Sequence, residues 1–160
     1  DLLSELVMRK MVESDFESFF DLQRDYDSQW MIALIERDFN DREHFKGHFQ
    51  KIISDPTNQS YMILHHGKLV GNIVCFKRDG VDEVGYMIAK EYWGKGIASF
   101  ALKKLLADIA IRPLHAGVCS DNAGSIRVLE KAGFKEMSRE KVKSKVRGCE
   151  VELVNYRLEL

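Results

Sequence analysis

Two glycines that flank a lysine, Gly94-Lys95-Gly96, stand between a strand-like run ending at Ile88 and an apolar repeat that begins at Ile97. The repeat predicts a helix, because its apolar residues recur at spacings of three and four. The first N–H groups of a helix have no acceptor within it, and glycine lets the backbone approach a ligand closely. The helix dipole adds partial positive charge at this end. The segment therefore predicts a site where main-chain N–H groups bind a phosphate or diphosphate.

Two common phosphate-binding loops do not fit these residues. A Walker A loop needs serine or threonine directly after its Gly-Lys pair, and here Gly96 follows Lys95. The dinucleotide-binding fingerprint needs a third glycine at a fixed offset and a strand-turn-helix unit at the start of the chain, and the sequence has neither. The predicted phosphate site is therefore neither a P-loop nor a Rossmann site.

The segment resembles motif A of the GNAT N-acetyltransferase superfamily, Gln/Arg-x-x-Gly-x-Gly/Ala, with Trp93 to Ala98 in that register. Trp93 stands where Gln or Arg is usual, which is similar to the branch that includes ribosomal-protein N-terminal acetyltransferases. A second run, Asn122 to Phe134, resembles GNAT motif B, Asn-x-x-Ser...Glu-Lys-x-Gly-Phe, at the family's usual distance from motif A. The resemblance covers about Tyr61 to Leu160, and more loosely Leu6 to Asp55.

The resemblance implies acetyl-coenzyme A (acetyl-CoA) as the acetyl donor, bound along the end of one strand and the start of the next helix. Main-chain groups of Met87 and Ile88 would bind the pantetheine where this strand parts from its neighbour. Asn122 would hold the pantetheine amide from the other side. The implied cofactor-binding residues are Met87, Ile88, Trp93, Gly94, Lys95, Gly96, Ile97, Ala98, Ser99, Asn122, Ser125 and Lys131.

Acetyl transfer to an amine needs a base for the amine, a donor to the developing oxyanion and a proton for the departing thiolate. GNAT enzymes commonly carry a tyrosine acid at the position that is Leu129 here, so no phenol is available there. The branch with Asn-x-x-Ser points to Ser125 for this role. The alternative is a serine that only satisfies backbone groups at a helix start.

Glu83 is the leading candidate for the base. Side chains alternate along a strand, so Glu83 shares a face with Gly85 and Met87, and Tyr86 lies on the other face. Glu83 could line a cleft and accept a proton through water. The alternative is a solvated carboxylate on an edge strand. Tyr86 is a second, cleft-lining candidate for the same role.

The composition predicts a single GNAT domain over residues 1–160. The 160 residues, 45% hydrophobic, suffice for one packed core and are few for two. The net charge of -1 argues against binding nucleic acid through phosphate neutralisation. The apolar stretches are too short to span a membrane, and the first five residues lack the pattern of a signal peptide. Widely spaced cysteines predict reduced core thiols and a cytoplasmic location: Cys75, Cys119 and Cys149.

The predicted elements follow the order βααβββαβαββ, which the GNAT fold also implies. This order describes an α/β (α+β) fold, a mixed and mostly antiparallel sheet flanked by about four helices. The first helix is predicted from a capping box at Ser14 to Glu17 as far as Tyr26, and the second from about Asp41 to Ser54. No element is assigned to Trp30 to Ile35. Strands are expected at Leu6–Met11, Tyr61–Leu64, Leu69–Lys77, the run ending at Ile88, Leu114–Cys119, Phe134–Val146 and Cys149–Leu158.

His44 and His48 have the spacing of a helical metal-binding pair. No third ligand is evident, so we expect ordinary surface or core histidines and no metal site. Three residues stand where GNAT enzymes usually build the acceptor pocket and are otherwise typical of a core: Trp30, Met31 and Phe39.

A basic stripe would occupy one face of any extended hairpin near the end of the chain, because its residues fall at every second position. It is either a solvated strand face or a contact to an acidic substrate or phosphate. The stripe consists of Arg139, Lys141, Lys143, Lys145 and Arg147.

Two functions follow from the resemblance. The first is an acetyl-CoA-dependent N-acetyltransferase that transfers the acetyl group directly, in a ternary complex, to a primary amine. The acceptor would be a protein N-terminus, an amino acid, a polyamine or a small-molecule amine. The second is a non-catalytic GNAT-fold module that binds acyl-CoA as a sensor, because the usual tyrosine acid is absent. Neither function involves nucleic acid or a membrane, and an exposed edge strand would allow a homodimer.

Overall fold

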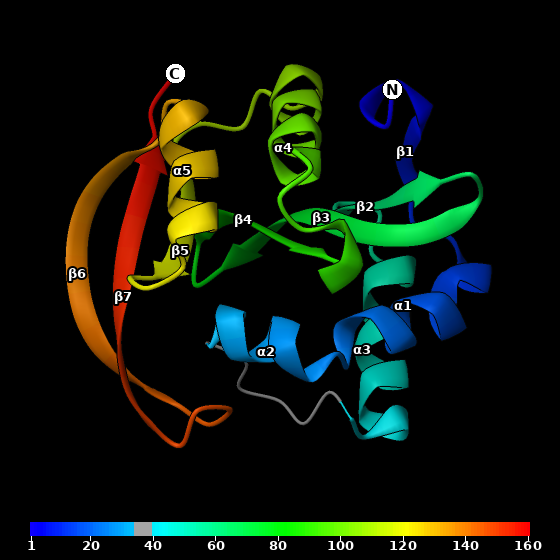
Figure 1. The fold of residues 1–160 in the computed structure, drawn as a ribbon, viewed down its shortest axis with the longest axis horizontal. Coiled ribbons are helices and arrows are strands. Elements are labelled where there is room, and N and C mark those ends of the chain that lie inside the picture. Colours follow the sequence, from blue (N-terminus) through cyan, green and yellow to red (C-terminus); the bar gives the residue numbers. More distant parts are fainter. Residues whose placement is uncertain (34–39) are drawn as a thin grey trace.

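A mixed sheet of seven strands forms the middle of the structure (Figure 1). The computed structural model describes residues 1–33 and 40–160. The strand order is β1-β2-β3-β4-β5-β7-β6, and all neighbours are antiparallel except β4 and β5, which run parallel. The strands are β1 (Leu6–Lys10), β2 (Gln59–His65), β3 (Lys68–Arg78), β4 (Val81–Ile88), β5 (Leu114–Cys119), β6 (Lys135–Ser144) and β7 (Cys149–Leu158).

Helices cover both faces of this sheet. Figure 1 shows α4 and α5 on one side and α1, α2 and α3 on the other. Three 3-10 turns, η1 (Leu3–Glu5), η2 (Glu13–Asp15) and η3 (Lys90–Tyr92), precede β1, α1 and the turn before α4. In the described part of the chain, none of the helices is both long and apolar enough to cross a membrane. The helices are α1 (Phe16–Gln23), α2 (Tyr26–Ile32), α3 (Arg42–Ser54), α4 (Ile97–Asp108) and α5 (Ala123–Lys131).

The mixed, mostly antiparallel α/β architecture is confirmed, and the described residues contain one helix more than expected. The prediction continued the first helix to about Tyr26, whereas α1 ends at Gln23. The Asp25 carboxylate accepts a hydrogen bond from the Ser28 N–H at 2.9 Å and so caps a new helix, α2. The run from Trp30 is therefore helical as far as Ile32. Residues Ile35 and Phe39 lie outside the described residues.

The capping box predicted at Ser14 to Glu17 does not form. The Asp15 carboxylate instead accepts a hydrogen bond from the Val12 N–H at 2.8 Å and a pair of hydrogen bonds from Arg9. The Arg9 guanidinium holds the pKa of this buried carboxyl below its usual range. Glu17 pairs with Arg42 of α3. The hydrogen bonds of Asp15 therefore link the end of β1 to the start of α1.

Each face of the sheet has its own apolar core. Alternate residues of the central strands pack against α4 and α5, among them Val84, Ala116, Val118, Val154 and Tyr156. The opposite face of β2 to β4 packs against the phenylalanines of α1 and α3, namely Phe19, Phe20, Phe45 and Phe49. Both phenylalanines of α3 are thus buried.

Two expectations about the last strands and the thiols need correction. Only the first part of the basic stripe is on a strand, because β6 ends at Ser144, so Lys145 and Arg147 lie in the turn. Arg147 is held by protein groups instead of being solvated. All three thiols are free, but Cys149 is exposed, whereas Cys75 and Cys119 are buried as expected. Burial raises the pKa of both buried thiols.

Gly71 of β3 lies where β3 and β4 approach closely. A Cβ at this position would lie 2.8 Å from Ile88 Cδ1 and 2.9 Å from the carbonyl oxygen of Met87. Since a backbone oxygen cannot move without displacing β4, Gly71→Ala is expected to lower the free energy of unfolding by about 1–3 kcal/mol. The matched control is Gly47→Ala in α3, where nothing lies within 4 Å, with an expected gain of about 0.5–1 kcal/mol. Urea denaturation measures both, and equal effects would contradict the close approach.

Candidate active site

Strands β4 and β5 meet at one point and then separate. Within the described residues a single register pair, Glu83 opposite His115, joins them. Beyond it β4 continues to Ile88 and β5 to Cys119. Parallel neighbours that continue without pairing leave main-chain groups free along both edges. The sheet therefore opens between β4 and β5, which is the opening that the GNAT resemblance implies.

The ladder between β3 and β4 decides which groups of β4 face this opening. The Ala89 N–H donates to Val70 O at 2.8 Å, and the register of the two strands is continuous. Because hydrogen-bonded pairs alternate along an antiparallel ladder, the main-chain groups of Met87 point toward β3. Those of Tyr86 and Ile88 point toward the opening. The expectation that the main-chain groups of Met87 face the opening does not fit this ladder, and those of Tyr86 face it instead.

The turn before α4 contains two glycines in the left-handed region, Gly94 with φ 74° and Gly96 with φ 81°. Gly96 occupies the N-cap position, and no side chain caps the helix. The first helical hydrogen bond runs from the Phe100 N–H to Gly96 O at 3.0 Å, so the N–H groups that precede Phe100 have no acceptor in the helix. A Cβ at Gly94 would meet nothing within 4 Å. Open space thus adjoins unpaired donors at the start of α4, which suits an anion.

Trp93 is half exposed, and its indole Nε1 donates a hydrogen bond to the carbonyl oxygen of Ile88 at 2.7 Å. This contact fastens the turn to the end of β4. It also occupies the Ile88 carbonyl, so the Ile88 N–H is the group of that residue that remains for a ligand. Sequence reasoning missed this contact, because indole donation to a carbonyl five residues back leaves no pattern in the sequence.

Asn122 caps α5 on the other side of the opening. Its side-chain oxygen accepts a hydrogen bond from the Ser125 N–H at 3.2 Å, and its Nδ2 points to the carbonyl oxygen of Met31 at 3.5 Å. Both ends of the amide are therefore engaged with protein groups. Because Asn122 satisfies the helix start, the Ser125 hydroxyl is not needed as a cap.

The Ser125 hydroxyl instead lies 2.6 Å from the hydroxyl of Tyr86, so one hydrogen bond spans the opening from α5 to β4. Tyr86 is half-buried, and burial raises the pKa of its phenol although the bond to Ser125 opposes that shift. One of the two hydroxyls donates this bond, so one O–H proton of the pair remains for another acceptor in a partly desolvated place. Leu129, at the position of the usual tyrosine acid, is 1% exposed and belongs to the core. Tyr86 was considered only as a base, and its pairing with Ser125 depends on tertiary packing that the sequence does not reveal.

Glu83 lies where β4 and β5 begin to separate. Its side chain is on the face of the sheet opposite α4 and α5. Its carboxylate forms an ion pair with Arg78 at 3.2 Å, and its side chain is 22% exposed. Glu83 and its partner His115 also line a cavity of about 580 Å³ on that face, together with residues of β6 and β7. The cavity therefore reaches the point where β4 and β5 part.

Arg147 of the β6–β7 turn contacts both α2 and the residues before α5. The Arg147 side chain is 7% exposed, although its partner Asp121 is largely accessible. Its Nε donates to the Trp30 carbonyl oxygen at 2.9 Å, its guanidinium lies 5.2 Å from the centre of the Trp30 ring, and its Nη2 donates to Asp121 at 3.1 Å. Trp30 and Met31 thus lie beside the residues that lead into α5. The structure places both near the opening and leaves Trp30 half exposed.

The remaining predicted residues surround the turn or lie away from it. Lys95 is exposed in the turn itself, Ile97 is 1% exposed and belongs to the core, and Ala98 and Ser99 follow, half-buried, in the first turn of α4. Lys131 is the last residue of α5, at the opposite end from Asn122, and is exposed. The site thus consists of a glycine turn, an opening in the sheet and a pair of hydroxyls across it.

A family model described as "Acetyltransferase (GNAT) domain" matches residues 5–135. The chain belongs to the GNAT acetyltransferase family. A curated relative of this GNAT domain, the Bacillus subtilis protein named "Putative ribosomal N-acetyltransferase YdaF", is 33% identical over 103 residues, which are 60% of this chain and 56% of the relative. The chain spans about half the length, or less, of the curated relatives that it matches.

Solved structures share the fold of this GNAT domain at low identity. Spermidine N-acetyltransferase from Vibrio cholerae, in complex with CoA and spermine, has a TM-score of 0.83 and 16% identity over 98% of this chain and 96% of its own. A phosphinothricin acetyltransferase from Sinorhizobium meliloti, in complex with acetyl-CoA, has a TM-score of 0.82 and 18% identity over 98% of this chain and 89% of its own. These likenesses show the fold.

Proposed function

We propose that this GNAT domain transfers the acetyl group of acetyl-CoA to a primary amine. The observation that carries the proposal is the glycine turn at the start of α4, whose unpaired N–H groups lie beside an opening spanned by Tyr86 and Ser125. The acceptor class is a protein N-terminus, an amino acid, a polyamine or another small-molecule amine. The names of relatives agree with such acceptors, since one is named for ribosomal acetylation and one structure contains spermine.

The cofactor would lie with its diphosphate at the turn, against the N–H groups from Gly94 to Ser99, where no side chain caps α4. Its pantetheine would follow the free edge of β4, where the main-chain groups of Tyr86 and the N–H of Ile88 face the opening. The thioester would then lie near the Tyr86 and Ser125 hydroxyls. An N–H group of this edge can donate to the oxyanion that develops during transfer.

Acetyl-CoA supplies an acyl group on a thiolate leaving group. The amine attacks the thioester carbon, the carbon–sulfur bond breaks, and the proton lost by the amine nitrogen is balanced by the one that the sulfur gains. The hydroxyl of Tyr86 or Ser125 that does not donate to the other would donate a hydrogen bond to the departing sulfur. The raised pKa keeps the Tyr86 phenol protonated at neutral pH. A thiol has a pKa of about 8.5, below that of a phenol, so the thiolate accepts a hydrogen bond from the phenol without deprotonating it.

The acceptor would approach from the face of Glu83, because the cavity of about 580 Å³ on that side reaches the root of the opening. The cofactor would occupy the other side, between α4 and α5. Glu83 would accept the amine proton, directly or through water. Its bond to Arg78 sets the position of the carboxylate at the cavity wall.

Glu83→Gln is expected to lower kcat by about 10–100-fold, because an amide cannot accept the amine proton. The pH dependence of the rate should change shape as well. The control is Arg78→Gln, which removes the ion-pair partner and leaves the carboxylate in place. Initial rates across a pH series measure both variants. A Glu83→Gln curve that overlays the wild type would remove Glu83 from the mechanism.

The alternative of a non-catalytic acyl-CoA sensor was suggested by the leucine at position 129. The hydroxyl pair of Tyr86 and Ser125 weakens that suggestion, because it offers donors from other positions. Release of free thiol from acetyl-CoA, followed with a thiol reagent across a panel of amines, tests the proposed transfer. The panel should include N-terminal peptides, amino acids and polyamines. Acetyl-CoA binding without thiol release on every amine would favour the sensor.

A further inference from the structure

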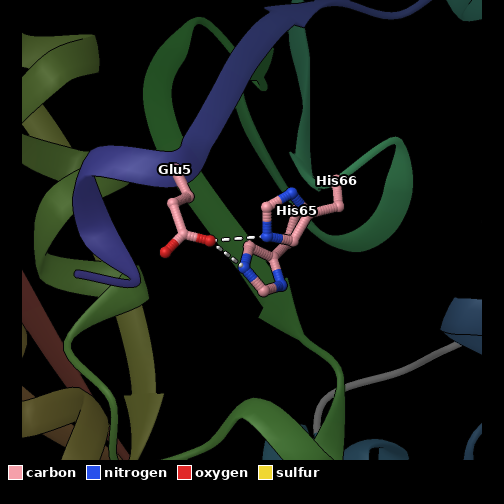
Figure 2. Close-up of side chains that lie close together, drawn as sticks. All are labelled: Glu5, His65 and His66. Carbon is pink, nitrogen blue, oxygen red and sulfur yellow. Dashed lines mark hydrogen bonds and ion pairs between the residues drawn. The ribbon is translucent and has the colours of Figure 1, made fainter.

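A cluster of two histidines and a glutamate lies on the side of the molecule where η1 meets the β2–β3 turn (Figure 2). Glu5 is the last residue of η1, His65 ends β2, and His66 is the first residue of the turn. The pairing of β1 with β2 places Leu6 opposite His65, so Glu5 is brought next to His66 across the ladder. The fold thus brings Glu5 beside two adjacent histidines that lie about sixty residues later in the sequence.

The three side chains converge on one point. Glu5 Oε2 lies 3.2 Å from His65 Nε2 and 2.5 Å from His66 Nε2, and the ligand atoms of all three lie within 4.8 Å of one another. A tetrahedral zinc ion with bonds of about 2.0–2.1 Å separates its ligand atoms by roughly 3.3 Å. One of the two contacts already has this length, and the other needs only a small change of the exposed His66 ring.

A neighbouring tyrosine orients the less accessible histidine. His65 Nδ1 lies 3.0 Å from the hydroxyl oxygen of Tyr92, and the two rings meet edge to face. Metal-bound histidines characteristically use the second ring nitrogen in such a bond, which fixes the ring and directs the first nitrogen to the ion. The backbone restrains the other histidine, because His66 has a φ of 50° and Gly67 a φ of 79° in the tight turn.

We propose that Glu5, His65 and His66 form a binding site for a divalent transition-metal ion, with zinc as the preferred class. Two imidazoles and one carboxylate match zinc and its neighbours, whereas magnesium and calcium favour sites made of oxygen ligands alone. Three protein ligands leave at least one position for water. The site is outside the opening of the sheet and differs from the expected absence of a metal, which considered only His44 and His48.

The bound ion would act on the turn that precedes α4. Tyr92 is the last residue of η3 and directly precedes Trp93, and Leu3 of η1 packs 3.9 Å from the place of a Cβ on Gly96. An ion held by Glu5 and both histidines therefore joins η1, the β2–β3 turn and η3 at one end of the glycine turn. Its role is to rigidify this region, and it takes no part in the transfer itself.

Titration calorimetry with zinc chloride tests the site on the chain without a histidine tag, after treatment with a chelator. The expected result is one zinc ion per chain. In a separate titration with cobalt(II) as a substitute for zinc, the bound ion should show the visible absorption typical of a low coordination number. His66→Asn and Glu5→Gln should each weaken zinc binding by more than about tenfold, since even the loss of a hydrogen bond to a metal ligand costs 10–100-fold. Asparagine tolerates the left-handed backbone at position 66, so this variant should fold.

Two controls identify the site. His44→Ala removes a histidine of the competing pair on α3, and Cys149→Ser removes the exposed thiol, and neither should change zinc affinity. The proposal is overturned if the wild type binds no zinc, or if His66→Asn and Glu5→Gln bind it as well as the wild type. It is equally overturned if His44→Ala or Cys149→Ser abolishes binding. In those cases the three residues form only a hydrogen-bonded cluster in which Glu5 accepts from both rings.

Discussion

Gly94→Ala combined with Gly96→Ala is expected to weaken acetyl-CoA binding by about 10–100-fold. Both glycines have left-handed φ angles, and an L-residue with a Cβ costs roughly 1–2 kcal/mol in that region at each position. The strained turn would relax to other angles and its N–H groups would no longer converge at the start of α4. Because these groups would be the main donors to the diphosphate in the proposed complex, cofactor affinity is the property expected to fall most. Titration calorimetry with acetyl-CoA measures it.

The matched control for this variant is Gly80→Ala in the β3–β4 turn. Gly80 has a φ of 78° and no atom within 4 Å of its added Cβ, so it carries the same backbone cost at a place away from α4. It should lose about as much stability in urea denaturation as either glycine substitution alone and keep its acetyl-CoA affinity. A double glycine variant that binds acetyl-CoA like the wild type, or a Gly80→Ala variant that loses it equally, would refute the role of the turn.

Tyr86→Phe and Ser125→Ala are each expected to lower kcat by about 100-fold and to change the KM for acetyl-CoA little. The two hydroxyls share one hydrogen bond of 2.6 Å, so either substitution removes the donor arrangement at the departing sulfur. The double variant should therefore lose little more than the single ones, because groups that act as a unit are not additive. Steady-state kinetics with a responsive amine measures all three.

The pH dependence gives a second test of the tyrosine. Burial raises the pKa of Tyr86 above its ordinary value, so the neutral phenol that donates the bond persists through neutral pH and is lost only as the pH rises through the raised pKa. No loss of rate from this group is expected at neutral or mildly alkaline pH. The control is Tyr61→Phe, whose hydroxyl donates to Gln59 at 2.9 Å on β2 and is not in the site. Equal losses in Tyr61→Phe and Tyr86→Phe would exclude a specific role.

Much of this arrangement is local and was therefore predictable from sequence. The glycine turn and α4 follow from spacing, because glycine and the helical repeat act over a few residues. The Asn122 cap of α5 is local as well. The sequence did not reveal that Asp25 caps a separate helix, α2. Only two residues, Arg24 and Asp25, separate α1 from α2, and so short a break resembles a continuous helix.

The parts that sequence did not reveal depend on pairing between distant elements. The ladder with β3, and not the sequence of β4, decides that Tyr86 and Ile88 face the opening while Met87 does not. The bond between Tyr86 and Ser125 needs α5 packed over β4. The cluster of Glu5, His65 and His66 needs β1 paired with β2 in one register. A single-residue slip would turn these side chains to the other face.

Comparison of acetyl-CoA with pantetheine as ligands tests most directly the claim that the turn at the start of α4 binds the diphosphate. Calorimetric titration should give one acetyl-CoA site per chain, protection against thermal unfolding, and binding of pantetheine that is weaker by at least about 100-fold, since it lacks the charged groups that the N–H donors hold. Absence of heat and of thermal protection with both acetyl-CoA and CoA, or equal affinity for pantetheine, would contradict the account.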